Sequence, residues 1–169
     1  MRKKDFAQFR FLKDAEGGVV TLDTQFMDER VLAAIDCDRW GLARLHIFEE
    51  AALRGEKLEA FQEEMAKLAE LRSDCVSRLL SWGRDGEELF YADSLLDGEP
   101  LPDYLGRVGA VPLAVSAAWV GDIARFLDGL EDGLRSFERF TTLNFQVVVD
   151  RRHRIAPVFS EFVGWTKPG

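Results

Sequence analysis

Residues 61–105 read FQEEMAKLAELRSDCVSRLLSWGRDGEELFYADSLLDGEPLPDYL, and this stretch decides the fold. It begins inside the segment 56–72, whose apolar residues recur at the spacing of one helix face and predict an amphipathic helix. The apolar runs 76–82 and 88–92 then flank the turn Arg84-Asp85-Gly86, a pattern typical of a β-hairpin. The apolar face of the predicted helix consists of Leu58, Phe61, Met65, Leu68 and Leu71.

The chain before this helix has the pattern of β-strands. The expected strands are 9–12, 19–22, 31–35 and 42–48. The turn Glu16-Gly17-Gly18 joins the first two into a hairpin, and the segment 36–41 is a turn between the other two. In the last strand Arg44 and His46 alternate with apolar residues, which indicates a half-buried strand.

The chain after residue 96 contains a break, two helices and a final hairpin. Residues 97–100, Asp-Gly-Glu-Pro, are typical of a linker. Expected beyond it are a short helix 102–107, a long helix opened by Pro112, and strands 145–149 and 155–159 joined by the basic loop 150–154. The long helix is predicted to be a core element from its apolar stripe, Val115, Trp119, Ile123, Phe126, Leu127 and Leu130. Strands and helices segregate along the chain, which predicts an α+β fold.

Composition excludes several classes of function. The chain has 169 residues, of which 47% are hydrophobic and 31% charged, and its net charge is −8, which disfavours nucleic acid as a partner. No apolar run approaches the ~20 residues of a membrane span, and no apolar run follows the basic N-terminus as it would in a secretory signal. Cys37 and Cys75 are expected to be reduced thiols of a cytoplasmic protein. His46 and His153 have no neighbours at metal-ligand spacing, so no metal is predicted.

The order of these elements resembles a serine/threonine protein kinase domain. Residues 61–72 are similar to the kinase helix αC, and Leu71-Arg72-Ser73-Asp74 to the turn that follows it. Residues 76–83 and 89–94 resemble the fourth and fifth strands, and Gly98-Glu99-Pro100-Leu101 resembles the Gly-Glu-x-Leu pattern after the hinge in bacterial kinases. The resemblance covers residues 31–160, is strongest from 61 to 105, and places the helix from Pro112 at αE.

This resemblance implies an architecture. Residues 1–97 would form a kinase-like N-lobe, an antiparallel sheet with one αC helix. Residues 98–169 would form a partial, truncated C-lobe with a β-hairpin, and both would belong to one kinase-like unit.

The resemblance also locates the positions where kinase chemistry would be carried out. The glycine-rich loop falls on 24–29, which contain no glycine and two acidic residues. The third-strand lysine falls on Leu45, with Arg44 expected on the opposite strand face. Glu64 matches the αC glutamate, either as a relic of the lysine–glutamate ion pair or as one more solvated carboxylate.

The remaining kinase positions fall near the final hairpin. The catalytic aspartate aligns with Thr141, the magnesium-binding asparagine with Gln146, and the first residue of the Asp-Phe-Gly triplet with Phe159. Glu161 lies two positions beyond that triplet's start, where a rescue role is conceivable. Phosphoryl transfer depends on neutralising phosphate charge, so these losses together predict no catalysis, no cofactor and no metal.

Three hypotheses about function follow from this resemblance. The first is a catalytically inactive, pseudokinase-like module of bacterial signalling that binds another protein or itself. The second is a divergent ATP-binding serine/threonine kinase, and the third is a structural domain of a longer signalling protein. Trp40 and Trp165, in an expected turn and tail, are candidate exposed anchors for a partner, and the basic loop 151–154 is either a solvated turn or a contact for an acidic partner.

Overall fold

The computed structural model describes residues 5–6, 8–22, 29–49, 56–130, 144–149 and 155–159. These residues belong to two compact units. The N-terminal unit contains the described residues up to Glu70 and the segment Arg78–Leu95. The C-terminal unit contains Leu71–Ser77 and the described residues from Leu96 onward.

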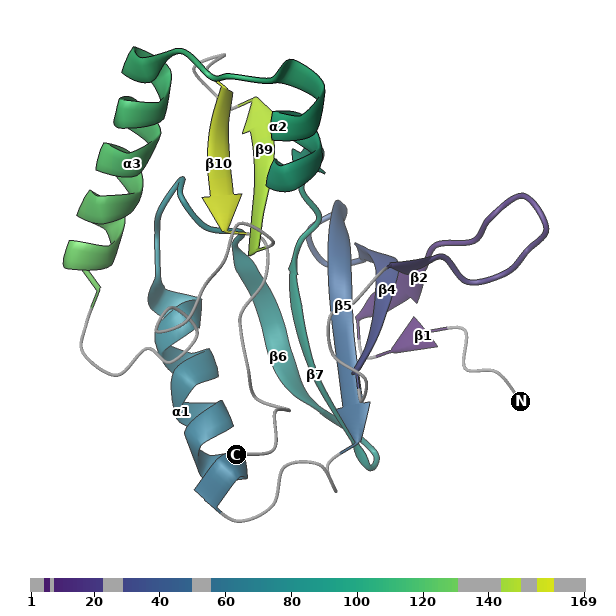
Figure 1. Cartoon of the computed structure of the whole chain (residues 1–169). Coiled ribbons are helices and arrows are strands. Elements are labelled where there is room, and N and C mark those ends of the chain that lie inside the picture. Colours follow the sequence, from purple (N-terminus) through teal and green to yellow (C-terminus); the bar gives the residue numbers. More distant parts are fainter. Residues whose placement is uncertain are drawn as a thin grey trace. The chain divides into compact units, whose positions relative to one another are not determined.

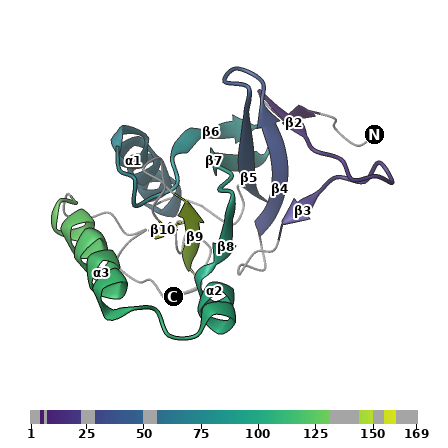
Figure 2. The ribbon, with the colours of Figure 1, turned by 90° about the horizontal axis from the view of Figure 1, so that it is seen from above.

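A seven-stranded antiparallel sheet forms most of the N-terminal unit. Its strand order is β1-β2-β4-β5-β7-β6, and β3 also pairs with β4. Strands β2 and β3 therefore share one edge of β4, as Figure 2 shows. The elements are β1 (Asp5–Phe6), β2 (Phe9–Phe11), β3 (Thr21–Leu22), β4 (Glu29–Asp36), β5 (Gly41–Glu49), α1 (Glu56–Glu70), β6 (Leu79–Asp85) and β7 (Glu88–Ser94).

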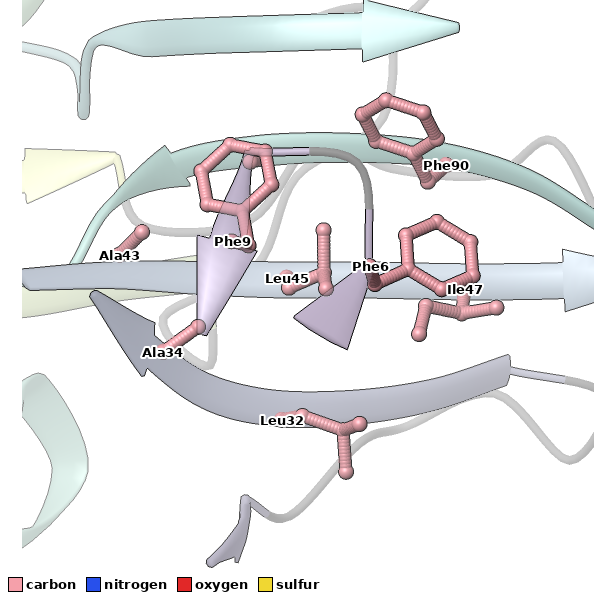
Figure 3. Close-up of a cluster of buried hydrophobic side chains, with 9 residues drawn as sticks. Phe6, Phe9, Leu32, Ala34, Ala43, Leu45, Ile47 and Phe90 are labelled. Atoms are coloured by element: carbon pink, nitrogen blue, oxygen red, sulfur yellow. The ribbon is translucent and has the colours of Figure 1, made fainter. Parts of the chain in front are cut away.

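One face of this sheet carries an apolar cluster (Figure 3). Strand alternation sends Leu45 and Ile47 of β5 to this face, and the rings of Phe6 and Phe9 cover it. Both rings meet Phe90 edge-on, with centroids 5.3 and 6.2 Å apart. The N-terminal strands β1 and β2 are therefore held by aromatic packing on the sheet as well as by strand pairing.

Helix α1 packs on the opposite face. The expected helix is confirmed, and Phe61, Met65 and Leu68 of its predicted apolar face are buried. The ring of Phe61 lies edge-on to Phe48 of β5, with centroids 5.3 Å apart. Because Phe48 shares its strand face with Arg44 and His46, these two polar residues also point to the α1 side of the sheet.

Two strand predictions need correction. The segment 42–48 was expected to be half-buried, but Arg44 and His46 are only 6% and 3% exposed, because α1 covers their face and buried carboxylates pair with them. The strand expected from Val76 begins at Leu79 instead. Val76 forms an isolated parallel bridge with Phe159 within the C-terminal unit.

The C-terminal unit combines a three-stranded antiparallel sheet with two helices, and Figure 1 shows β9 and β10 side by side. Residues 98–100 of the predicted linker 97–100 form a strand. A Cβ added to Gly98 would lie 2.8 Å from the carbonyl oxygen of Val147, so only glycine permits this close pairing of β8 and β9. The elements are β8 (Gly98–Pro100), α2 (Leu101–Val108), α3 (Leu113–Asp128), β9 (Phe145–Val149) and β10 (Ile155–Phe159).

Helix α3 differs from its prediction in burial. Pro112 is its N-cap, as a start signal at that position suggests, but the helix is not a core element. Of the α3 residues, all of which the structure describes, Trp119 alone is buried. Its indole Nε1 donates a hydrogen bond of 2.9 Å to the carbonyl oxygen of Ile155, which ties α3 to β10.

The arrangement of strands and helices confirms the expected α+β class. Within the described ranges, no helix is both long and apolar enough to cross a membrane.

Candidate functional site

A buried group of charged side chains lies on the α1 face of the N-terminal sheet. Strands β5 and β7 are neighbours, and their register places Arg44 opposite Asp93. Arg44 donates two hydrogen bonds to this carboxylate, from Nε to Oδ1 at 3.0 Å and from Nη2 to Oδ2 at 2.6 Å. The Arg44 side chain is 8% exposed and that of Asp93 is fully buried, so water competes little with this bidentate pair.

His46 extends this network toward β4. Its Nδ1 lies 2.7 Å from Oε1 of Glu29, and its Nε2 lies 3.3 Å from Oδ1 of Asp93, a charge contact without the alignment of a hydrogen bond. The imidazole stacks on the ring of Tyr91, with centroids 4.1 Å apart and planes 11° from parallel. We call Glu29, Arg44, His46 and Asp93 the charged network.

The network shifts the protonation of its members. Burial alone would lower the pKa of His46, but the contacts with Asp93 and Glu29 outweigh it and raise the pKa above its ordinary value of 6.5. Burial would raise the pKa of Asp93, but the positive charge of Arg44, aided by His46, lowers that pKa to about 2. With His46 protonated, two positive and two negative groups neutralise one another, which is the condition for keeping charges buried.

This arrangement neutralises the buried charges of the sheet. Each charge meets an opposite charge within the network, and the four side chains are at most 8% exposed. A general acid or base must reach its substrate, and a phosphate-binding cation must face its anion. In the charged network the cations face carboxylates of their own sheet.

The residues that the resemblance selects in the N-terminal unit lie on different faces. Leu45, assigned to the kinase lysine, is fully buried in the apolar cluster on the face away from α1. The polar residues on the α1 face of β5 are its neighbours Arg44 and His46. Glu64 of α1 is 3% exposed, so its interpretation as a solvated carboxylate is wrong.

The predicted positions in the C-terminal unit lie on its hairpin. Phe159 is 1% exposed and packs against Phe145 and Phe126, with ring centroids 4.1 and 5.8 Å away. Gln146, on β9, has a buried Oε1 without a hydrogen-bond partner among the described residues. Thr141, Glu161, Trp165, residues 24–28 of the glycine-loop position and the basic loop 151–154 lie outside the described residues.

Sequence reasoning missed Glu29 and Asp93 as members of one site. The sequence contained a signal for this pairing. Asp93 ends the apolar run Leu89–Ala92, and Arg44 lies between the apolar residues Ala43 and Leu45. Charged residues are rarely buried without a partner, so two such strands imply a cross-strand ion pair. The pairing itself required the register of β5 with β7.

The raised pKa of His46 gives the fold a testable pH dependence. A basic group whose pKa is raised by folding contributes stability that is complete below its unfolded pKa of 6.5 and is lost as pH rises through the folded value. We therefore expect the free energy of unfolding, measured by urea denaturation from pH 6 to pH 9, to fall with rising pH. The variant His46→Gln should lose most of this slope, and equal slopes in wild type and His46→Gln would contradict the assignment.

Comparison with solved structures identifies the fold. The kinase domain of PknI from M. tuberculosis matches with a TM-score of 0.69 and 21% identity, covering 94% of this chain and 59% of that one. A second PknI kinase-domain structure matches with 0.69 and 20%, covering 96% and 62%. Rad53 in complex with AMP-PNP matches with 0.70 and 16%, covering 92% and 38%. No family of related sequences and no curated protein matches the chain.

Proposed function

Because this chain has a protein-kinase-like fold, we propose that it is a kinase-related module that does not transfer phosphate and acts by binding protein. The observation that carries the proposal is the bidentate pairing of Arg44 with Asp93 on the α1 face of β5. In kinases the cation of the third strand binds the nucleotide's phosphates. There the lysine also pairs with the αC glutamate, whereas here the arginine on that strand is held at both Nε and Nη2 by Asp93 of the neighbouring strand β7.

The energetics of the charged network support this proposal. To bind a phosphate, Arg44 would have to leave a buried carboxylate, and breaking such a pair costs about 3 to 5 kcal/mol. The phosphate would also approach the negative charges of Asp93 and Glu29, which oppose it. A nucleotide would therefore have to offset both effects before gaining any affinity in the N-terminal unit.

The C-terminal unit supports the same proposal at the aligned metal positions. Phe159 stands where the resemblance places the magnesium-binding aspartate, and its ring is packed among other aromatic rings. Magnesium is held by oxygen ligands, usually carboxylates and phosphates. Within the described residues, no cluster of three His, Cys, Asp or Glu side chains is arranged to hold a metal ion.

The competing function is a divergent ATP-binding kinase. It is favoured by the likeness of the fold to Rad53, which was solved with AMP-PNP. This chain spans about 60% of the length of the PknI kinase domains. Any activity, substrate or partner assigned to the whole protein is therefore a proposal as well. Nucleotide binding separates the two functions.

We expect no thermal stabilisation by nucleotide. Differential scanning fluorimetry with 5 mM ATP and 10 mM MgCl₂ should leave the melting temperature within about 0.5 °C of its value in MgCl₂ alone. A dissociation constant of 0.5 mM would already stabilise the fold by about 1.4 kcal/mol, or several degrees. AMP with MgCl₂ is the matched control, because it tests adenosine binding with little phosphate charge. A shift of several degrees with ATP, or incorporation of labelled phosphate into the protein, would reject the inactive function.

A further inference from the structure

Helix α3 packs on its own unit through one side only. On this side Trp119 is buried and hydrogen-bonded to β10, which lies beside α3 in Figure 1. The ring of Phe126 lies 5.8 Å from that of Phe159 and extends the same contact. The first nine residues of the helix, Leu113–Gly121, nevertheless include no charged side chain on any side. A helix segment without a charged face is usually buried all round, which points to a partner for the outward side of α3.

The outward side of α3 is a regular apolar stripe. We call it the α3 stripe, and it consists of Leu113, Ala117, Val120 and Ala124. At 3.6 residues per turn, these four residues fall within about 60° around the helix. Leu113 and Val120 are 84% and 66% exposed, and both alanines are exposed as well. Their alternating spacing of four and three residues is that of a coiled-coil seam, which predicts another helix as the occupant.

We propose that the α3 stripe of one copy of this chain packs against the α3 stripe of a second copy, with the two helices antiparallel. In this register Leu113 lies opposite Ala124 of the second copy, and Ala117 lies opposite Val120. Each of the four layers then joins one large and one small side chain, so the helices can pack at an even separation. A parallel pair would join large to large and alanine to alanine, and would leave gaps between the alanines.

Charge complementarity favours the same antiparallel orientation. The N-terminus of α3 begins at Pro112 without a side-chain cap, and its first turn contains no acidic residue to balance the positive end of the helix dipole. The antiparallel register brings Asp128, in the last turn, within about one helical turn of Pro112 of the second copy. The other charged residues of α3, Asp122 and Arg125, pair with each other on other sides of the helix. The stripe itself therefore meets no like charge.

The surface that matches the α3 stripe is the stripe itself, and a helix can meet its own stripe only in a second copy. From Leu113 to Ala124 the stripe is about 16 Å long, so its occupant needs an apolar surface of similar length. Among the described residues of the N-terminal unit, the exposed large apolar side chains are Trp40 and Leu42, at 86% and 53%. These two neighbours on one hairpin do not form a seam of four layers.

The contact is isologous, because the same four residues serve on both copies, and the assembly closes as a dimer. The stripe spans fewer than two heptads, whereas a stable coiled coil needs about three or four. The association is therefore weak and depends on concentration. The net charge of −8 on each copy opposes it, so salt should strengthen it.

The inference rests on the protein-binding part of the proposed function and names the partner, and the two proposals fail separately. Nucleotide titration tests whether the module is inactive, and self-association tests whether two α3 stripes meet. A chain that binds ATP and still forms the α3 dimer would reject the first proposal alone. A monomeric chain that ignores ATP would reject the second alone.

Sedimentation velocity of the purified full chain at about 5 µM to 500 µM tests the contact. We expect the weight-average mass of the wild type to rise with concentration from 19.2 kDa toward twice that value. Ala117→Arg should remain monomeric, because its guanidinium would face Val120 of the second copy. Ala118→Arg is the matched control, with the same substitution about 100° around the helix and outside the stripe, and it should associate as the wild type does.

Both alanines are exposed, so the two variants should have the melting temperature of the wild type at low concentration. A wild type that is monomeric throughout the range would overturn the proposal. So would association of Ala117→Arg equal to that of the wild type, or loss of association in Ala117→Arg and Ala118→Arg alike, since the contact would then lie elsewhere.

Disulfide cross-linking tests the antiparallel register. In full chains that carry Cys37→Ser and Cys75→Ser, Leu113→Cys and Ala124→Cys are mixed and oxidised with copper phenanthroline, and intact mass identifies the products. We expect the mixed dimer, because these two positions lie opposite each other. Leu113→Cys alone should not cross-link, because its two copies would be about 16 Å apart, beyond the reach of a disulfide. Cross-linking of Leu113→Cys alone, without the mixed dimer, would overturn the antiparallel pairing.

Discussion

The variant Asp93→Asn is expected to lose about 3 to 5 kcal/mol of unfolding free energy, a large part of the stability of a domain this size. The substitution keeps the shape of the side chain but removes its charge, so Arg44 loses the carboxylate that it contacts through two nitrogen atoms, and His46 loses one of its two carboxylates. Urea denaturation at pH 6, followed by circular dichroism, measures the loss. The lowered pKa of Asp93, about 2, means that the pair stays intact down to acidic pH and is lost as pH falls from about 4 toward 2.

Two further variants show whether the charge pair causes the effect. Glu88→Gln breaks the exposed ion pair of Glu88 with Arg30, also across strands, and should cost less than about 1 kcal/mol because water replaces the partner. The double variant Arg44→Met/Asp93→Leu removes both charges and should regain most of the stability lost in Asp93→Asn. If Asp93→Asn proved as mild as Glu88→Gln, the charged network would not be the constraint that we describe.

The variant Phe159→Ala is expected to destabilise the C-terminal unit by about 3 to 5 kcal/mol. The ring is 1% exposed and packs against Phe145 and Phe126, so its removal leaves a cavity in the aromatic core of this unit. The backbone bonds of Phe159 to Cys75 and Ser77 do not involve the side chain and remain possible. Denaturation followed by near-ultraviolet circular dichroism reports directly on these aromatic side chains.

The controls for Phe159 separate packing from a latent catalytic role. Ile155→Ala, on the same strand but 46% exposed, should change stability by well under half as much. Phe159→Asp places a carboxylate at the aligned metal position, and we expect it to unfold the unit because the charge would be buried among aromatic rings. A folded Phe159→Asp variant that binds magnesium would refute the view that this position serves packing.

The spacing of apolar residues predicted the elements in which that spacing fits only a helix or only a strand. Helix α1 follows from the spacing of Phe61, Met65 and Leu68, and the final hairpin follows from two apolar runs around a polar loop. The strand at 98–100 was predicted as a linker because Gly98 and Pro100 usually break structure. It pairs with β9 through a close approach that only the tertiary fold specifies.

The candidate site was less accessible to sequence reasoning. The resemblance to kinases assigned the lysine position to Leu45, but the fold puts Leu45 on the face away from α1, and the polar side chains beside it reach the α1 face. Strand alternation predicts that Arg44 and Leu45 diverge, although it does not say which one faces the helix. That assignment required the contact between Phe48 and Phe61. The partner Asp93 is 49 residues away in sequence from Arg44, beyond the range of any local pattern.

The bridge between Val76 and Phe159 has a consequence for how this protein can be dissected. The Ser77 amide donates to the carbonyl of Phe159, and the Phe159 amide donates to the carbonyl of Cys75, so these two residues pair with the edge of β10. The segment Arg78–Leu95, which follows them in the chain, belongs to the other unit. A cut after Leu95 would separate Cys75 and Ser77 from β10. The edge of β10 would then have unpaired backbone groups, which promote aggregation. Neither unit is one continuous segment of the chain. A truncated or fused protein therefore preserves both units only if it contains both of them.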